Sequence, residues 1–224
     1  MHHHWGEIDR RHLIKLGTVG LAALSLPGAA RAMMAQGFTH GVASGEPAPH
    51  SVLLWTRYAA ANDAALTAEL SETEDFSKVV AGGSVVAAGE RDHTAKLVVD
   101  GLKPGRWYHY RFIAPDGTRS VTGRTRTLPQ GATKAFNLAL FSCSNMPFGW
   151  FNAYGHAAAR GDIDLVAHVG DYLYEYKAGD YPSAKQALPG REIQPAHEIV
   201  ALADYRLRYA AYRADPDLQK LHQL

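Results

Sequence analysis

An acidic residue and three tyrosines follow an apolar segment in the second half of the chain. The segment DLVAHVGD, residues 164–171, has the composition of a buried strand and ends in Asp171. Tyrosines follow at positions 172, 174 and 176, and Tyr174 lies three residues beyond Asp171. A carboxylate and a phenol at this spacing reach the same site if the chain turns there. Both groups bind a highly charged metal ion strongly, because the ion deprotonates them.

The only cysteine of the chain lies at the end of another apolar segment. FNLALFSC, residues 136–143, ends in Cys143. A buried, inert thiol is one explanation of a lone cysteine, and a metal-bound thiolate is the other. A thiolate together with a phenolate favours trivalent iron over magnesium or calcium, which prefer carboxylates and carbonyls. The alternative for Asp171 and the tyrosines is structural, as a helix N-cap and interior aromatic side chains.

The elements predicted around these residues place them at one edge of a sheet. A helix is predicted over residues 150–161, and strand, helix and strand at this spacing indicate a βαβ unit. The right-handed crossover makes the strands parallel, so Cys143 and Asp171 lie at the same edge, where ligands of open α/β sheets bind. We expect His168, inside the second strand, to be a core residue or a neighbour of the ligands. Asn145 could approach the site from the loop after Cys143.

Residues 37–129 have the pattern of an all-β domain. Six segments with strand composition are separated by turn formers, at residues 51–58, 66–72, 82–89, 94–102, 106–114 and 121–128. This pattern predicts a small β-sandwich. The run Gly101 to Gly105 before Tyr108 is similar to the fibronectin type III pattern, in which a tyrosine hydroxyl bonds back across the corner before its strand.

The first 32 residues are typical of an export signal. A charged stretch with Arg10 and Arg11 precedes an apolar run of small residues, which ends in the Ala-Arg-Ala sequence of a cleavage site. The arginine pair resembles a twin-arginine signal read by the Tat machinery; a Sec signal or an uncleaved anchor is the alternative. The apolar run is short for a membrane span, so we expect no stable membrane insertion after cleavage and a periplasmic or secreted protein. The net charge of +1 and its even spread show no nucleic-acid-binding signature.

Taken together, six segments resemble the alkaline phosphatase D family of exported PhoD-like phosphatases. They are GVASGEP (41–47), VLLWTR (52–57), GRTRTLP (123–129), FSCSN (141–145), HVGDYLYEY (168–176) and HEIVALADYRLRYAAYRADPDLQKLH (197–222). The resemblance implies a fibronectin type III-like β-sandwich followed by an α/β calcineurin-like metallophosphoesterase domain. It further implies an iron (Fe³⁺) and calcium centre that hydrolyses phosphate monoesters and diesters. By this resemblance Cys143 and Tyr174 are iron ligands, and Asp171 is the catalytic carboxylate that bridges the metals.

The end of the chain departs from the family pattern. A helix is predicted over residues 196–213, with Leu202, Tyr205, Tyr209 and Tyr212 on one face, and a second helix begins at Asp215-Pro216. Family members continue into a motif containing Trp-Asp-Asp-His-Glu and further metal ligands. We therefore expect residues 133–224 to be the truncated N-terminal part of the phosphoesterase domain, inactive as this chain alone.

Two other functions fit parts of the sequence. The sandwich could act as an extracellular binding module, which a clustered, exposed aromatic face would favour. The βαβ unit could bind a nucleotide, but the turn after Cys143 lacks the glycine-rich phosphate-binding pattern.

Overall fold

Two antiparallel β-sheets form the first part of the protein. The computed structural model describes residues 36–224, and the predicted export signal, residues 1–32, lies outside them. One sheet has the strand order β1-β2-β5, with β1 (Val42–Gly45), β2 (Val52–Arg57) and β5 (Thr94–Val99). The other has the order β4-β3-β6-β7, with β3 (Ala64–Ser71), β4 (Val79–Ala87), β6 (Trp107–Ile113) and β7 (Gly123–Arg126). Strand β1 was not predicted, and a short 3-10 helix, η1 (Gly89–Arg91), precedes β5.

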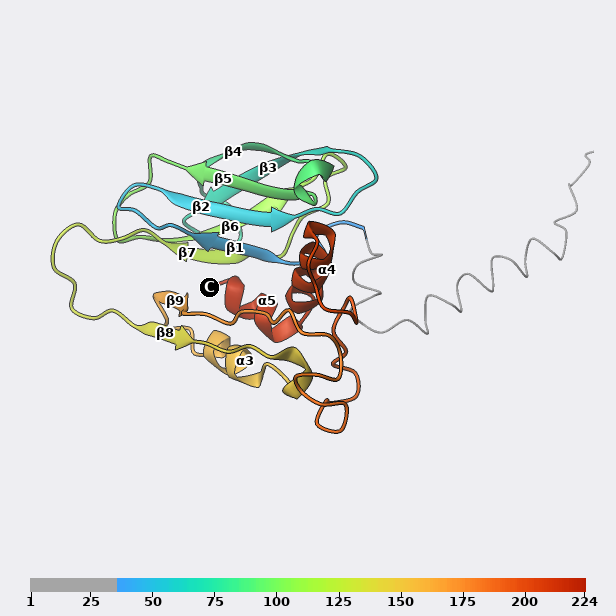
Figure 1. Ribbon diagram of the computed structural model, residues 1–224. Helices are drawn as coiled ribbons and strands as arrows, with labels where there is room; N and C mark the ends of the chain where they lie inside the picture. Colours follow the sequence, from blue (N-terminus) through green and yellow to red (C-terminus); the bar gives the residue numbers. More distant parts are fainter. Residues whose placement is uncertain (1–35) are drawn as a thin grey trace, which may run out of the picture.

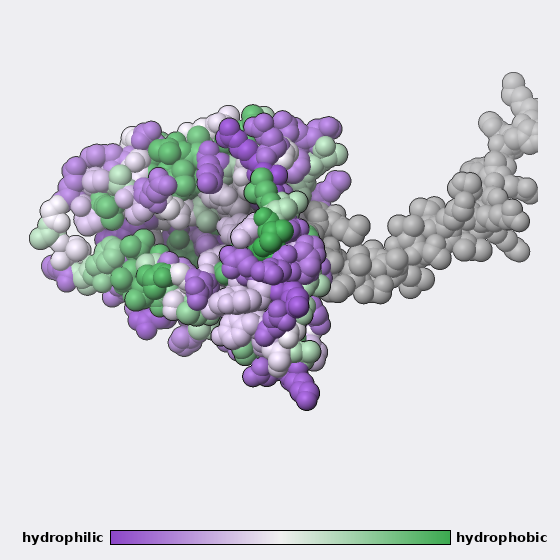
Figure 2. Space-filling model, in the orientation of Figure 1, coloured by the Kyte–Doolittle hydropathy of each residue, from purple (hydrophilic) through white to green (hydrophobic). Residues whose placement is uncertain are grey.

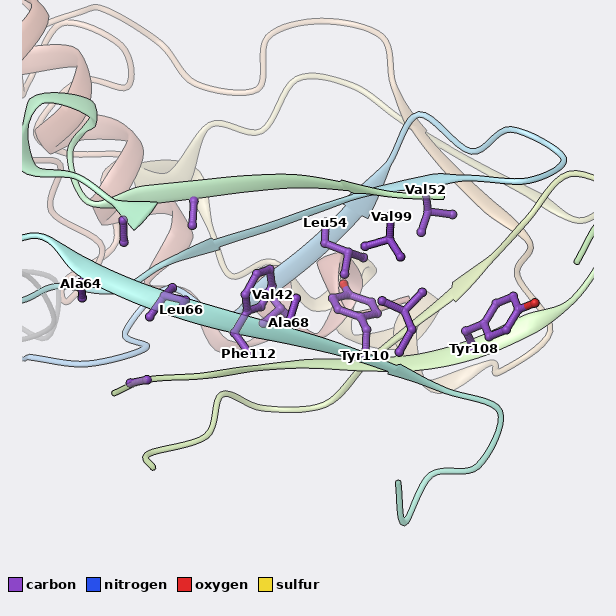
Figure 3. Packing of buried hydrophobic residues seen from close by; sticks show 14 of the residues in the cluster. Val42, Val52, Leu54, Ala64, Leu66, Ala68, Val99, Tyr108, Tyr110 and Phe112 are labelled. Atoms are coloured by element: carbon purple, nitrogen blue, oxygen red, sulfur yellow. The ribbon is translucent and has the colours of Figure 1, made fainter. Parts of the chain in front are cut away.

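The two sheets share one apolar core (Figure 3). Along β6 every second side chain is buried, because successive side chains of a strand point to opposite faces. Tyr108, Tyr110 and Phe112 of β6 therefore point into the core, where they meet Leu54 of β2 and Leu66 of β3. The alternation along β6 thus supplies three large side chains to the core.

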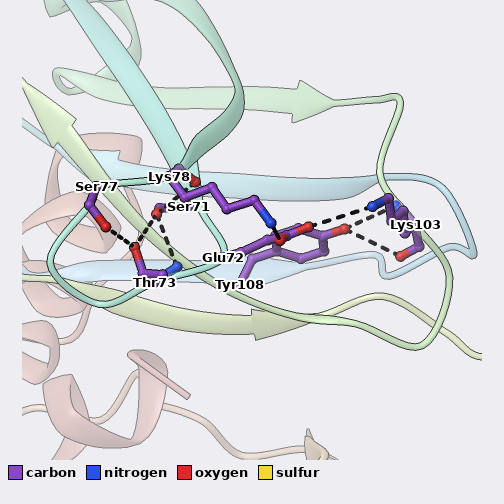
Figure 4. A network of polar contacts seen from close by, with 7 residues as sticks. All are labelled: Ser71, Glu72, Thr73, Ser77, Lys78, Lys103 and Tyr108. Atoms are coloured by element: carbon purple, nitrogen blue, oxygen red, sulfur yellow. Dashed lines mark hydrogen bonds and ion pairs between the residues drawn. The ribbon is translucent and has the colours of Figure 1, made fainter.

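The predicted tyrosine corner is confirmed. The hydroxyl of Tyr108 accepts a hydrogen bond from the backbone N–H of Lys103 at 2.9 Å, as Figure 4 shows. The bond ties the start of β6 to the turn before it.

A strand–helix–strand unit follows the sandwich. It consists of β8 (Leu138–Phe141), α3 (Asn152–Ala159) and β9 (Leu165–His168), with a 3-10 helix, η2 (Met146–Phe148), before α3. Strands β8 and β9 pair in parallel, with Leu138 opposite Leu165 and Phe141 opposite His168. The predicted parallel βαβ unit is confirmed, and its strand ends lie side by side (Figure 1).

The two faces of the β8–β9 sheet have different surroundings. On one face Ala139 and Phe141 pack with α3 and with the last helix of the chain, α5 (Pro216–His222). On the other face Leu138 and Leu140 are exposed, and so is Val169 just after β9. Figure 2 shows the apolar surface at this end of the molecule.

The predicted helix over residues 196–213 begins later than expected. Helix α4 covers Leu202–Arg213, because the carboxylate of Asp204 accepts hydrogen bonds from the N–H groups of Val200 and Ala201 and so caps the helix there. Of the four residues predicted to share one face of this helix, Tyr212 is buried, whereas Leu202, Tyr205 and Tyr209 are exposed. Arg208 and Ala211 are buried as well. The predicted helix start at Asp215-Pro216 is confirmed by α5.

Polar contacts connect the sandwich to the rest of the described chain. The buried guanidinium of Arg213 in α4 donates to the carbonyl of His40 at 2.8 Å and lies 4.7 Å from the ring centre of Trp55. Arg126 of β7 forms an ion pair with Asp164, just before β9. Within residues 36–224, no helix is both long enough and apolar enough to cross a membrane.

Candidate metal centre

The chain segments after β8 and β9 stay paired beyond the sheet. The N–H of Val169 donates to the carbonyl of Phe141 at 2.9 Å, and that of Cys143 to the carbonyl of Gly170 at 3.1 Å. The N–H of Ser144 donates to the carbonyl of Asp171 at 2.8 Å. The backbone therefore fixes Cys143 and Asp171 next to each other, at the carboxyl ends of two parallel strands.

Two side chains converge on one carboxylate oxygen of a third. The Sγ of Cys143 lies 3.5 Å from Oδ2 of Asp171, and the hydroxyl of Tyr174 lies 3.0 Å from the same oxygen. Cys143 is exposed, so the buried, inert thiol considered for it is wrong. Among residues 36–224 the first helix after Asp171 is α4, which begins at Leu202, so Asp171 is not an N-cap. The three groups predicted as metal ligands thus share one accessible site.

Both Cys143 and Asp171 have left-handed backbone conformations. Their φ angles are 61° and 50°, a region that residues other than glycine seldom adopt, although Asp and Asn enter it more readily than Cys. Such a conformation costs on the order of 1–3 kcal/mol and is kept where the surrounding structure imposes it, commonly at functional sites. Here the paired backbone of the two segments imposes it, and the result is that both side chains point to the same site.

The pKa of Tyr174 is affected by the two acidic groups beside it, the Asp171 carboxyl and the Cys143 thiol. Desolvation, together with hydrogen bonds to Asp171 and Cys143, raises the pKa of Tyr174. Without a cation, each additional negative charge in the group disfavours the phenolate. A bound cation reverses this preference, because it stabilises every anion that it contacts.

A buried hydrogen-bonded group, which sequence reasoning missed, supports the Cys143 segment from below. The hydroxyl of Ser144 is hydrogen-bonded to the hydroxyl of Tyr154 in α3 and lies 2.8 Å from Nε2 of His168. Burial lowers the pKa of His168, which favours the neutral ring. The Nε2 atom of His168 is thus directed to the hydroxyls of Ser144 and Tyr154. The signal for Ser144 was its place directly after Cys143 at a strand end.

The remaining predicted residues have different positions. The Asn145 side chain donates to the carbonyl of Tyr181 at 3.4 Å, so it contacts the loop opposite and not the Asp171 carboxylate. Tyr172 is directed to the other side, where its hydroxyl is hydrogen-bonded to Nε2 of His222 at 3.0 Å. Tyr176 stacks against Tyr174 with ring centres 6.2 Å apart.

The chemical types of the three donor groups suit a trivalent cation, but three donors are too few to fill its coordination sphere. A thiol, a carboxylate and a phenol can supply three anionic donors, a combination suited to iron(III). Residues 36–224 contain no group of three or more His, Cys, Asp or Glu side chains placed to hold a metal ion. The phenol of Tyr174 is therefore needed to bring the number of donors to three.

Comparison with known proteins gives two family matches and two close relatives. Residues 23–129 match the model of the PhoD-like phosphatase N-terminal domain, and residues 138–224 match that of the PhoD-like phosphatase. The chain is 36% identical over 196 residues to alkaline phosphatase D of Bacillus subtilis (strain 168), a match that covers 83% of this chain and 33% of that protein. It is 35% identical to the solved structure of PhoD, with a TM-score of 0.76, covering 84% of this chain and 37% of that one. The chain thus spans about a third of the length of these relatives.

Proposed function

This chain belongs to the PhoD-like phosphatase family, and we propose that it contributes one side of a metal centre that hydrolyses phosphate monoesters and diesters. The observation that carries the proposal is the convergence of Cys143 and Tyr174 on one carboxylate oxygen of Asp171. Its place at the carboxyl ends of two parallel strands is where α/β folds bind ligands.

We propose iron(III) and calcium as the metal ions. Cys143, Asp171 and Tyr174 would hold iron, and Asp171 would also contact the second ion. When bound, two metal ions hold the phosphoryl oxygens and lower the pKa of a water molecule that attacks phosphorus. The substrate would be a phosphate ester.

The chain's own side chains have distinct tasks in this proposal. Cys143 and Tyr174 would bind as anions and neutralise the charge of the ion, while Asp171 occupies the centre of the group. Ser144 is 5% exposed and engaged with Tyr154 and His168, so it serves to hold the Cys143 segment and not as a nucleophile. A metal-activated water removes the need for a serine nucleophile.

The alternative of a binding module gains no support from the surface of the sandwich. An exposed aromatic face would have favoured it. Among the described residues of the sandwich, the large apolar side chains that are exposed are aliphatic: Val79, Val80, Val86, Val98, Val121 and Leu128.

The metal proposal is tested by the colour of the iron-loaded chain. Adding iron(III) should produce a visible absorption band from phenolate charge transfer, and Tyr174→Phe should remove it. Tyr205→Phe, at a half-exposed tyrosine of α4 outside the site, is the matched control and should leave the band unchanged. Because three donors do not fill an iron coordination sphere, we expect desalting to strip the metal and the 224-residue chain to show no phosphodiester turnover. A band that persists in Tyr174→Phe would contradict the assignment.

We also propose that the protein is exported by the twin-arginine pathway to the periplasm or the exterior. Changing both Arg10 and Arg11 to lysine should then block export, because that pathway reads the arginine pair. The measurement is the amount of protein in the periplasmic and cytoplasmic fractions of cells that produce either version. Undiminished accumulation of the Lys-Lys version outside the cytoplasm would indicate a Sec signal instead.

A further inference from the structure

Four aromatic rings lie together beside the metal ligands. The rings of Tyr174 and Tyr176 are nearly parallel, at 22°, and Tyr181 stands edge-on to both, with ring centres 5.7 Å and 5.6 Å away. Phe148 completes the group, with its ring centre 5.1 Å from that of Tyr181. We call these four residues the aromatic cluster. Since Tyr174 belongs both to it and to the metal centre, the two sites are contiguous.

The aromatic cluster is open to solvent. Phe148, Tyr176 and Tyr181 are 42%, 49% and 48% exposed. Burial of aromatic surface is normally a large stabilising contribution, so three half-exposed rings in contact form an available apolar surface.

The loop that carries Tyr181 is held in place by hydrogen bonds. It faces the segment after Cys143, where Asn145 donates to the carbonyl of Tyr181. Further along, the N–H of Leu188 donates to the carbonyl of Pro147 at 2.9 Å. The exposed rings are therefore presented by two connected segments.

A cavity continues this surface away from the metal centre. Its volume is about 310 Å³, and its lining includes Pro147, Tyr181, Pro182, Leu188, Pro189 and Ile193. Tyr181 belongs to both the cavity and the aromatic cluster. Ligand sites are typically mostly apolar hollows with a few polar groups, and this volume accommodates a small organic group.

We propose that Phe148, Tyr176 and Tyr181 form a subsite for the organic group of the phosphate ester, and that this group carries a ring with an apolar face. The inference rests on the proposed function, since the phosphoryl group is taken to bind at the metal ions that Asp171, Cys143 and Tyr174 would hold. The ester's organic group then projects onto the neighbouring surface, which is aromatic. An apolar ring face packs on an aromatic side chain, and one such stack changes affinity by roughly five- to a hundredfold. Either an aryl group or a sugar ring offers that face.

The test is a binding titration of the 224-residue chain, followed by NMR. The three probes are phenyl phosphate, glucose 6-phosphate and glycerol 3-phosphate, of which the last has no ring. At least one ring-bearing probe should bind about fivefold or more tightly than glycerol 3-phosphate. Preference for phenyl phosphate identifies an aryl group, and preference for glucose 6-phosphate identifies a sugar.

Two variants test whether the tighter binding of a ring-bearing probe depends on the aromatic cluster. Tyr176→Leu and Tyr181→Leu keep an apolar side chain without the ring, and each should reduce the preference. Tyr205→Leu, outside the aromatic cluster, should leave it unchanged. A cooperative thermal unfolding transition verifies that each variant is folded. If Tyr181→Leu does not fold, Tyr176→Leu alone is sufficient for the test.

Equal binding of the three probes, or a preference that survives in every folded cluster variant, would overturn the subsite. The iron absorption band, measured on the same samples, separates the two proposals. A ring preference without an iron band overturns the metal centre alone, whereas an iron band without a ring preference overturns the subsite alone.

Discussion

Replacing Asp171 by asparagine should remove most hydrolytic activity from a version of the protein extended to the length of its relatives. The Oδ2 atom of Asp171 is the one that both Cys143 and Tyr174 approach, at 3.5 and 3.0 Å, so its charge lies at the centre of the donor set. Loss of a residue that merely supports a ligand lowers metal affinity by about 10–100-fold. Loss of a central ligand should therefore lower kcat/KM for a simple phosphodiester by about a hundredfold or more. The measurements are kcat/KM and bound iron per protein.

The neighbouring Glu175 provides the control for Asp171. It is exposed, and its side chain makes no hydrogen bond within the described residues, so Glu175→Gln removes the same charge from nearly the same place. We expect nearly full activity from this variant. Cys143→Ala and Tyr174→Phe should be intermediate, because each removes one donor at the edge of the group. Full activity in Asp171→Asn would show that the metal centre lies elsewhere.

Replacing Asp215 by alanine should destabilise the βαβ part more than any exposed substitution. Asp215 and Arg191 form an ion pair at 2.6 Å in which both side chains are 3% exposed. The other carboxylate oxygen of Asp215 accepts from the N–H groups of Asp217 and Leu218 and caps α5. The change leaves a buried guanidinium unpaired, which costs about 3–5 kcal/mol, and the lost cap adds about 1 kcal/mol. Urea denaturation should show this fall in the free energy of unfolding.

Two further variants separate the charge from the cap. Asp215→Asn keeps an oxygen that can cap α5 and loses only the charge, so it should be less damaging than Asp215→Ala by about 1 kcal/mol. The pair Arg191→Met with Asp215→Asn leaves no unpaired charge and should recover a large part of the loss, since an apolar replacement of a buried ion pair is often neutral. If Asp215→Ala unfolds at the same urea concentration as the parent, the pair contributes nothing and the argument fails.

The strands could be predicted because their signal is local. The predicted segments are rich in β-branched and aromatic residues and are separated by turn formers such as Lys103-Pro104-Gly105, and both features can be read from short stretches of the sequence. Strand β1 escaped prediction: its four residues, VASG, include a single large apolar side chain, Val42. Its place in the sheet depends on pairing with β2, which is a contact between separate segments.

The helices were predicted near their observed positions, but the burial of Arg208 in α4 was not. Arginine side chains are normally exposed. Arg208 is buried because its guanidinium donates to backbone carbonyls of the preceding loop, at Gln194 and Pro195. Those partners lie 13 and 14 residues away, and the periodicity of a helix carries no information about them.

For the candidate site, the sequence indicated which strand ends carry the proposed ligands and not what surrounds them. Cys143 and Asp171 lie at adjacent strand ends because parallel pairing of β8 and β9 follows from their spacing. The aromatic cluster depends on the fold of the loop that carries Tyr181, a polar segment without periodicity. Its contact with Phe148 could be found only in three dimensions.

The left-handed backbone at Cys143 and Asp171 has a consequence for anyone who seeks to make this protein more heat-resistant. Glycine adopts such a conformation without a steric penalty, so a procedure that optimises folding alone would favour glycine at Cys143 and, more weakly, at Asp171. Each replacement would relax the chain and delete a donor of the proposed centre. If the proposed centre is correct, thermostability and activity are opposed at these two positions, as is usual where a strained residue serves function. A screen for thermostable variants should hold both residues fixed and seek its gains elsewhere in the molecule.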